Sequence, residues 1–162
     1  MDYIKRYKID EFNDYCTLNG LIPPEDIMAK ETELVLKGEN YIYINESIIK
    51  EMHRKKEEHD NWESDYKCIS SLRLRGIEEE KLGNIENAIS SYQKCIEKGE
   101  QSVFSMFHTY AYAYERIIVL FHKTKQYNNE IQYINTLLKH DSLSASIINK
   151  YKERLNKINL KK

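Results

Sequence analysis

The amino-acid sequence predicts an all-α protein, and three observations support this fold class. The chain of 162 residues contains only 5 Gly and 2 Pro, so it lacks the many turn-forming residues of a β fold. Charged residues make up 31% and apolar residues 41%, a balance that suits helices with solvated outer faces. Several segments also repeat apolar residues every three or four positions, which is the period of an amphipathic helix.

The N-terminal segment, residues 1–66, is expected to be helical. A short helix is predicted over Ile9–Leu18, and Asn19-Gly20 would end it. Pro23-Pro24 followed by two acidic residues predicts the start of a second helix, since proline suits the first turn and acids suit its positive end. This helix is expected to run to Leu36 and to stop at Gly38.

The second half of this segment is more ambiguous. Tyr41-Ile42-Tyr43-Ile44 has strand-forming residues, but Asn45-Glu46-Ser47 directly after it is a plausible helix cap. We therefore expect a helix from residue 45 onward. Residues 53–65, which are mostly charged, are interpreted as a solvated helix end or linker, with Trp62 as the one large apolar anchor.

Residues 67–162 predict a second, repeat-like part. Its first helix is expected over residues 66–82 and its second over 85–98, separated by Gly83-Asn84. Glycine adopts the left-handed conformation at no steric cost, so it suits the end of a helix. Gly76 and Ala88 have small side chains, and we expect them to contact each other where the two helices cross.

A degenerate second copy follows over residues 114–141. Lys125-Gln126-Tyr127 takes the place of Gly83-Asn84-Ile85, at an offset of 42 positions. Extra residues between the copies are expected to extend a helix around residues 102–110. Residues 144–160 have one apolar and one polar face, which predicts a C-terminal capping helix.

Residues 69–141 resemble tetratricopeptide repeats, which are helix-turn-helix units of about 34 residues. The first copy has the residues typical of the family at Leu72, Gly76, Ala88 and Tyr92. The second copy departs from the pattern at Ile118 and Glu130, so its helix crossing is expected to be wider or rotated. The resemblance implies a superhelix of paired helices. Two pairs are few for a stable stack, so either residues 24–58 form a further layer or the chain pairs with a second subunit.

The resemblance also implies a groove lined by the first helix of each repeat. Ser70 and seven further positions match the groove positions of the family; the seven predicted to bind a partner are Arg73, Ile77, Glu80, Tyr112, Glu115, Val119 and His122. Their mixture of apolar and charged side chains suits a peptide or a partner helix. Tyr112 also lies off the apolar stripe formed by its aromatic neighbours, which favours a role at an interface. Alternatively, the N-terminal helices fold into this groove and bury it.

Other classes of function find little support in the sequence. No catalytic or metal-binding motif is present, so we expect no enzyme activity, no metal and no cofactor. A net charge of −1 argues against nucleic acid, and no apolar run is long enough to predict a membrane span. Three widely spaced cysteines favour a reduced, cytoplasmic setting.

The sequence therefore predicts a non-enzymatic adaptor or scaffold that binds a protein or peptide. Two alternatives stay open. One is an inhibitor, encoded by a phage or mobile element, that covers the surface of a larger enzyme. The other is a regulatory subunit of an obligate complex, which would explain the small number of repeats.

Overall fold

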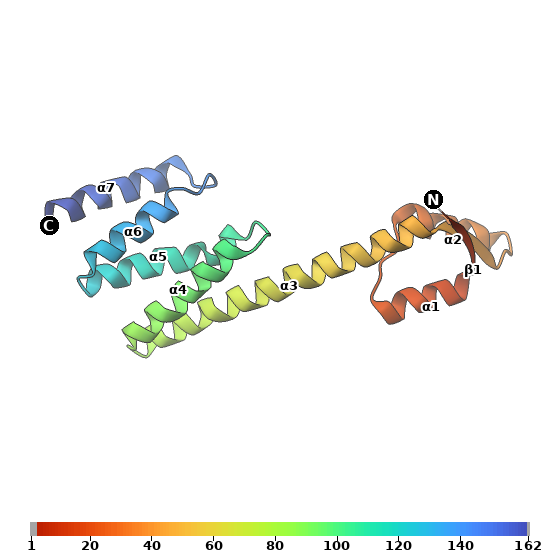
Figure 1. Ribbon diagram of the computed structural model, residues 1–162, viewed down its shortest axis with the longest axis horizontal. Helices are drawn as coiled ribbons and strands as arrows, with labels where there is room; N and C mark the ends of the chain where they lie inside the picture. Colours follow the sequence, from red (N-terminus) through yellow and green to blue (C-terminus); the bar gives the residue numbers. More distant parts are fainter. Residues whose placement is uncertain (1–2, 162) are drawn as a thin grey trace. The chain divides into compact units, whose positions relative to one another are not determined.

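The structure, a computed structural model, describes residues 3–161, and these residues are mainly helical, as predicted (Figure 1). The chain forms two compact units, residues 1–62 and 63–162, and the division falls within one helix. In chain order the elements are β1 (Ile4–Lys8), α1 (Ile9–Asn19), α2 (Glu25–Leu36), β2 (Tyr41–Asn45), α3 (Glu46–Lys81), α4 (Ile85–Gln101), α5 (Phe107–Lys123), α6 (Tyr127–Leu137) and α7 (Ala145–Lys161).

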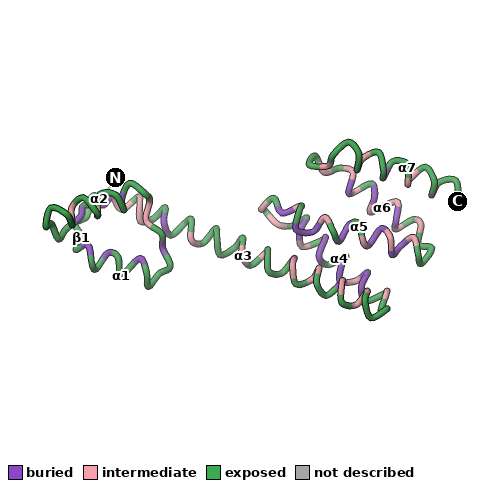
Figure 2. The backbone as a smooth tube through the Cα atoms, turned by 180° about the vertical axis from the view of Figure 1, so that it is seen from behind, coloured by how far each residue is buried: buried purple, intermediate pink, exposed green. Residues whose placement is uncertain are grey.

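The first unit packs α1, α2 and the start of α3 with a small sheet. Strands β1 and β2 pair antiparallel, with Ile4 opposite Asn45 and Lys8 opposite Tyr41. Both helices between the strands were predicted, and Gly20 ends α1 with a φ of 64°. The core of the unit consists of eight buried residues: Ile9, Phe12, Cys16, Leu21, Ile27, Ile42, Ile44 and Met52 (Figure 2).

The two strands were not predicted, and they correct the all-α assignment of the N-terminal segment. In β2, Ile42 and Ile44 are 1% exposed while Tyr41 and Tyr43 face outward, so the strand alternates between core and solvent. The helix that follows starts at Glu46, close to the predicted position. The side chain of Asn45 accepts a hydrogen bond from the backbone N–H of Ser47 at 3.0 Å, as a cap would.

Of the two alternatives for residues 53–65, the linker is wrong, because these residues form a solvated stretch within the continuous helix α3 and not its end. Ion pairs one helical turn apart support this charged stretch. Arg54 Nη1 lies 2.6 Å from Glu58, Lys56 Nζ lies 2.6 Å from Asp60, and two further residues pair in the same way, Glu63 and Lys67. Such pairs stabilise a helix that has little apolar periodicity of its own.

The second unit consists of successive helices joined by short turns. The C-terminal part of α3 forms a hairpin with α4, α5 forms a second hairpin with α6, and α7 follows (Figures 1 and 2). The two hairpin turns use a left-handed residue at equivalent positions, Gly83 with a φ of 79° and Lys125 with a φ of 58°. The shared apolar core of this unit includes Tyr92, Tyr114 and Ile134, all with no exposed surface.

The connection between the hairpins differs from the prediction. Residues 102–106 are not helical, so the expected extension of a helix through residues 102–110 is wrong for its first half. The hydroxyl of Ser102 donates to Asp65 at 2.7 Å and accepts from the backbone N–H of Phe104 at 3.2 Å. These side-chain bonds give the backbone an alternative to continuing the helix.

The closest neighbour of Gly76 was not predicted. A Cβ atom placed at Gly76 would lie 2.5 Å from Cε1 of Tyr92, so the nearest neighbour is the tyrosine ring and not Ala88. The equivalent positions of the second hairpin are Ile118 and Ile134, both without exposed surface. In the first hairpin, a glycine, which has no side chain, therefore packs against a large tyrosine ring. In the second hairpin, both positions are occupied by isoleucine, a branched residue of medium size.

Candidate functional site

The predicted binding residues of α3 and α5 include two that join these helices. The guanidinium Nη1 of Arg73 donates to the backbone oxygen of Thr109 at 3.0 Å. The carboxylate of Glu80 forms an ion pair with Arg116. Both contacts connect α3 with α5. Arg73 and Glu80 therefore have partners within the unit, although both side chains are only half-buried.

The environment of Glu80 keeps its carboxylate ionised. Burial by itself would raise the pKa of Glu80, but hydrogen bonds from Arg116 and from the hydroxyl of Tyr92 outweigh burial and lower the pKa below its usual value. The Tyr92 hydroxyl donates to Glu80 at 2.9 Å. Burial, followed by this hydrogen bond, raises the pKa of Tyr92 well above its usual value. The group is therefore a fixed ion pair rather than a titrating acid–base pair near neutral pH.

His122, a third predicted residue, takes part in a charged network around a buried acid. Glu130 has no exposed surface, and its Oε1 accepts a hydrogen bond from Nε of Arg154 at 2.8 Å. Its Oε2 lies 3.0 Å from Nδ1 of His122. The network joins α5, α6 and α7, and it explains how a carboxylate is accommodated where the tetratricopeptide pattern has a small residue.

The other four predicted residues are less engaged in contacts. Tyr112 and Glu115 are exposed on α5, while Ile77 and Val119 are half-buried. His122 of α5 and residues of α7 line one pocket, so α7 lies beside this part of α5, and Glu115 acts electrostatically on the buried Tyr151 of α7. We call the surface formed by the seven predicted residues and the adjoining side of α7 the α3–α5–α7 face.

The remaining aromatic residues at the start of α5 are core residues, as interpreted from their spacing. Tyr110 and Tyr114 are buried, and the ring of Phe107 stacks on that of His140 with centroids 4.1 Å apart. Glu100 accepts a hydrogen bond from the hydroxyl of Tyr114 at 2.6 Å. Tyr112, in contrast, is 42% exposed, which agrees with its place off the apolar stripe.

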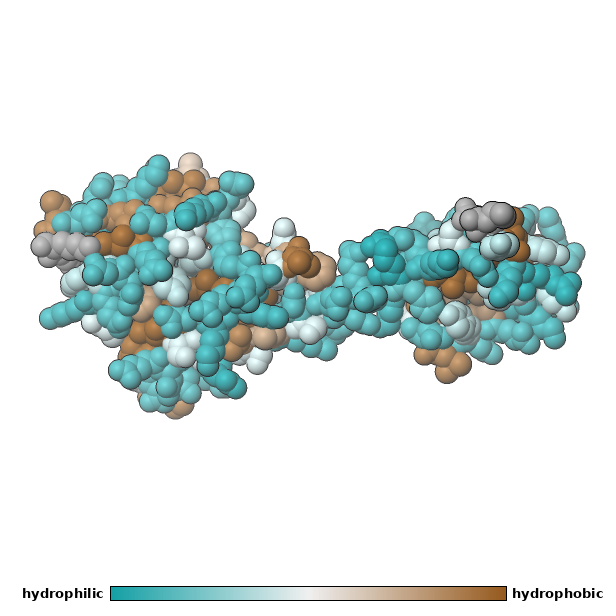
Figure 3. All heavy atoms as spheres, in the orientation of Figure 1, coloured by the Kyte–Doolittle hydropathy of each residue, from teal (hydrophilic) through white to brown (hydrophobic). Residues whose placement is uncertain are grey.

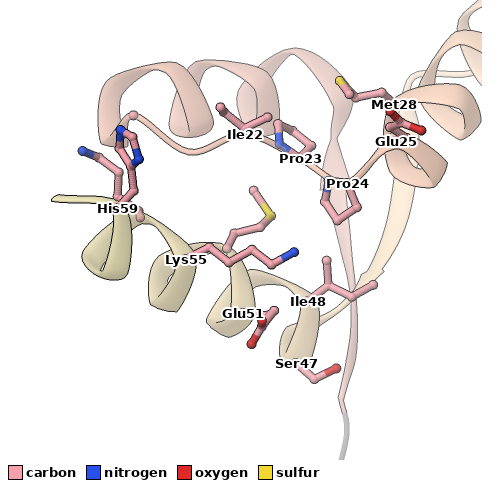
Figure 4. A pocket seen from close by; sticks show the side chains of 13 residues that line it. Ile22, Pro23, Pro24, Glu25, Met28, Ser47, Ile48, Glu51, Lys55 and His59 are labelled. Atoms are coloured by element: carbon pink, nitrogen blue, oxygen red, sulfur yellow. The ribbon is translucent and has the colours of Figure 1, made fainter. Parts of the chain in front are cut away.

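A second candidate surface, which the sequence did not predict, lies in the first unit. A groove of about 770 Å³ separates the α1–α2 connection from the beginning of α3 (Figure 4). Ile22 and Pro23 lie on one side, and Ile48 and Lys55 face them from α3. We call this the connection–α3 groove.

Apolar side chains at the connection–α3 groove are poorly covered by the rest of the unit. Ile22 is 82% exposed and Met28 is 41% exposed. Lys55 also lines the groove and is exposed, whereas Lys56 is paired with Asp60 at 2.6 Å. The only sign of this groove in the sequence was Ile22, an apolar residue directly before Pro23-Pro24, and a single apolar residue is not enough to predict a binding site.

The surface as a whole is mainly hydrophilic. In the view of Figure 3, hydrophilic residues cover most of each unit and hydrophobic residues form separate patches. Among residues 3–161, no helix has both the length and the apolar character needed to cross a membrane. Within the same residues, no group of three or more His, Cys, Asp or Glu side chains is arranged to hold a metal ion.

The comparisons with known proteins leave the fold and the two surfaces as the basis for a functional assignment. No protein-family model, no curated protein and no solved structure matches this chain.

Proposed function

We propose that this chain is a non-enzymatic adaptor or scaffold of tetratricopeptide-like architecture that binds a protein or peptide on its α3–α5–α7 face. The observation that carries this proposal is that some polar residues of that face have partners within the unit whereas others are exposed to solvent. Arg73, Glu80 and His122 have polar partners inside the unit, while Tyr112 and Glu115 are left to solvent. Exposed tyrosine beside half-buried aliphatic residues is a composition that favours protein partners.

The repeat architecture is supported by two equivalent features of the hairpins. Gly83 and Lys125 occupy the same place in successive turns, and both adopt a positive φ. A positive φ is uncommon for lysine, so its recurrence at the position predicted from the sequence favours a common hairpin plan.

A matched pair of charge reversals tests the α3–α5–α7 face. Glu115 and Glu97 are both exposed helical residues, and each acts electrostatically on one tyrosine, the buried Tyr151 or the half-buried Tyr133. Glu97 lies on α4, outside the proposed face. A partner captured by the full chain from cells that carry the gene would be identified, purified and titrated directly against the variants.

We expect Glu115→Lys and Tyr112→Ala each to weaken this direct binding about tenfold, as for residues at the centre of an interface. Glu97→Lys should bind as the wild type does. Unchanged affinity in both Glu115→Lys and Tyr112→Ala would show that the α3–α5–α7 face is not the binding surface.

A scaffold needs a second surface, and the connection–α3 groove supplies one within the first unit. Its occupant in this proposal is the apolar face of an amphipathic helix, with an acidic residue at the end that meets Lys55. The flexible side chain of an exposed methionine, here Met28, adapts well to such a face.

Ile22 and Leu36 form a matched pair for testing this groove, because both are apolar and 82% exposed but only Ile22 lines it. For a purified second partner, we expect Ile22→Asp to abolish measurable binding and Leu36→Asp to leave it unchanged. Equal binding by the two variants would exclude the groove.

A further inference from the structure

We infer that α7 and His122 form a binding site for an acidic segment of a protein partner. The site is a pocket of about 640 Å³ in the second unit. It is lined by His122 of α5 and by residues of α7, namely Lys150, Glu153, Arg154, Lys157, Ile158 and Leu160. This inference rests on the proposed protein-binding function and specifies the chemistry of the partner.

The charge of this region differs from that of the whole chain. Between Lys150 and Lys162 the sequence contains six basic residues and one acidic residue, although the complete chain has a net charge of −1. The positive charge is therefore concentrated at the C-terminal helix. Such a local excess attracts a negatively charged partner and repels a positive one.

Internal contacts neutralise only part of this charge. Arg154 and His122 both approach the buried carboxylate of Glu130, so both side chains are engaged within the unit. Lys150 and Lys157 line the same pocket and are exposed. The Nζ atom of Lys150 lies 5.5 Å from the centroid of the Tyr151 ring, which holds the ammonium group near the helix surface.

The spacing of these two lysines defines the kind of segment that fits. They are seven positions apart on one helix, which corresponds to about 10 Å along the axis. In the extended polyproline II conformation, carboxylates three residues apart lie on the same side and span about 9 Å. Both lysines can then pair with one extended acidic segment.

Apolar residues at the pocket favour a peptide over a nucleic acid. Two apolar residues line the pocket, Ile158, which is buried, and Leu160, which is 87% exposed. Glu153 also lines the pocket, so acidic residues that are spaced apart and can avoid its carboxylate fit better than a continuous row of phosphates. A segment with an acidic residue at every third position and apolar residues between matches this mixture of lysine, isoleucine and leucine.

Lys152 provides a matched control for the test, because it is an exposed lysine of α7 that does not line the pocket. The probe is a short fluorescent peptide with glutamate at every third position and leucine between, and the comparison peptide has glutamine in place of glutamate. Binding to the full chain is measured by fluorescence anisotropy at low and at physiological salt. Circular dichroism establishes that the variants fold.

We expect the acidic peptide to bind at least tenfold more tightly than its glutamine counterpart, with an affinity that falls as salt rises. The double variant Lys150→Glu/Lys157→Glu should lose about tenfold or more, and Lys152→Glu should change binding less than twofold. Equal binding of the two peptides, or equal loss in both variants, would overturn the inference. Tighter binding of a single-stranded oligonucleotide at the same lysines would also overturn it.

This result is separable from the test of the proposed function. If the acidic peptide fails to bind while a purified partner still depends on Tyr112 and Glu115, the inference is wrong and the protein-binding function stands. If no protein partner binds the chain, or if a partner binds both face variants as it binds the wild type, the proposed function itself fails.

Discussion

Replacing Gly76 by alanine tests the closest packing contact in the second unit. The added Cβ would lie 2.5, 2.6 and 2.9 Å from three atoms of the Tyr92 ring. Ordinary carbon–carbon contacts lie at about 3.5–4.0 Å, so the overlap is about 1 Å. The ring has little freedom to move away, since Tyr92 has no exposed surface and its hydroxyl is held by Glu80 at 2.9 Å.

Two effects of opposite sign determine the free energy of unfolding of this variant. Overpacking a core costs about 1–3 kcal/mol, and an overlap of about 1 Å with a ring that is held in place corresponds to the upper part of this range, about 2–3 kcal/mol. Alanine in a helix is favoured over glycine by about 1 kcal/mol. We therefore expect Gly76→Ala to lower the free energy of unfolding of the second unit by about 1–2 kcal/mol, because the steric overlap outweighs the gain in helix propensity.

A double-mutant cycle separates the two effects. Tyr92→Ala alone should cost about 3–5 kcal/mol through the cavity it creates. In that background the ring is absent, so Gly76→Ala should stabilise by about 1 kcal/mol. The coupling energy between the two positions should then be about 2–3 kcal/mol.

The assay has to report on the second unit alone, because the chain contains two compact units. Cys95 serves this purpose, since it has no exposed surface and its thiol donates to the backbone oxygen of Ile69 at 3.3 Å. Pulses of iodoacetamide over a urea series, followed by mass spectrometry, give the fraction of chains with Cys95 exposed. A Gly76→Ala protein that equals or exceeds the wild type in stability would refute the packing argument.

Three further predictions concern thiols and buried acids. Iodoacetamide at mildly alkaline pH should modify the exposed Cys68 of the folded protein but not Cys16 or Cys95. Burial raises the pKa of the Cys16 thiol, and it raises the pKa of the Cys95 thiol to about 11. Rapid labelling of all three cysteines would contradict the burial of Cys16 and Cys95 in the two cores. Glu80 has a lowered pKa in the folded state, so its stabilising effect is complete above its ordinary pKa of about 4.3 and is lost as the pH falls through the folded value. Urea unfolding should therefore show a larger cost of Glu80→Gln at neutral pH than near pH 3, and a cost independent of pH would oppose this reasoning. Glu130→Ala should lower the free energy of unfolding by about 3 kcal/mol, because it leaves Arg154 and His122 without the carboxylate that they contact. Labelling of Cys95 over a urea series measures this change. An unchanged free energy of unfolding would mean that these contacts contribute no net stability.

Much of the helical structure was predictable because its signals are local. Gly20 and Gly83 have positive φ and end helices as expected, and the acidic residues after Pro23-Pro24 begin α2. The equivalence of Lys125 with Gly83 was also visible in the sequence, from the alignment of the two copies. These features depend on residues a few positions apart, so a sequence pattern is sufficient to detect them.

The candidate surfaces were only partly predictable. The positions on α3 and α5 follow from the helical period, but their contacts do not. Glu80 pairs with Arg116, 36 positions away, and Glu130 is buried by a contact from Arg154. The connection–α3 groove, which includes the exposed Ile22, was missed entirely, because exposure depends on what the rest of the unit covers.

By itself, the sequence determined that this protein is mainly helical and where most of its helices begin and end. The tertiary structure decided which segments pair as β1 and β2, which of the charged groups are neutralised internally, and which apolar side chains stay uncovered. The physical reason is the range of the interactions. Capping, turn formation and helical periodicity act within one or two turns, whereas strand pairing, burial and ion pairing between helices depend on residues brought together from distant parts of the chain.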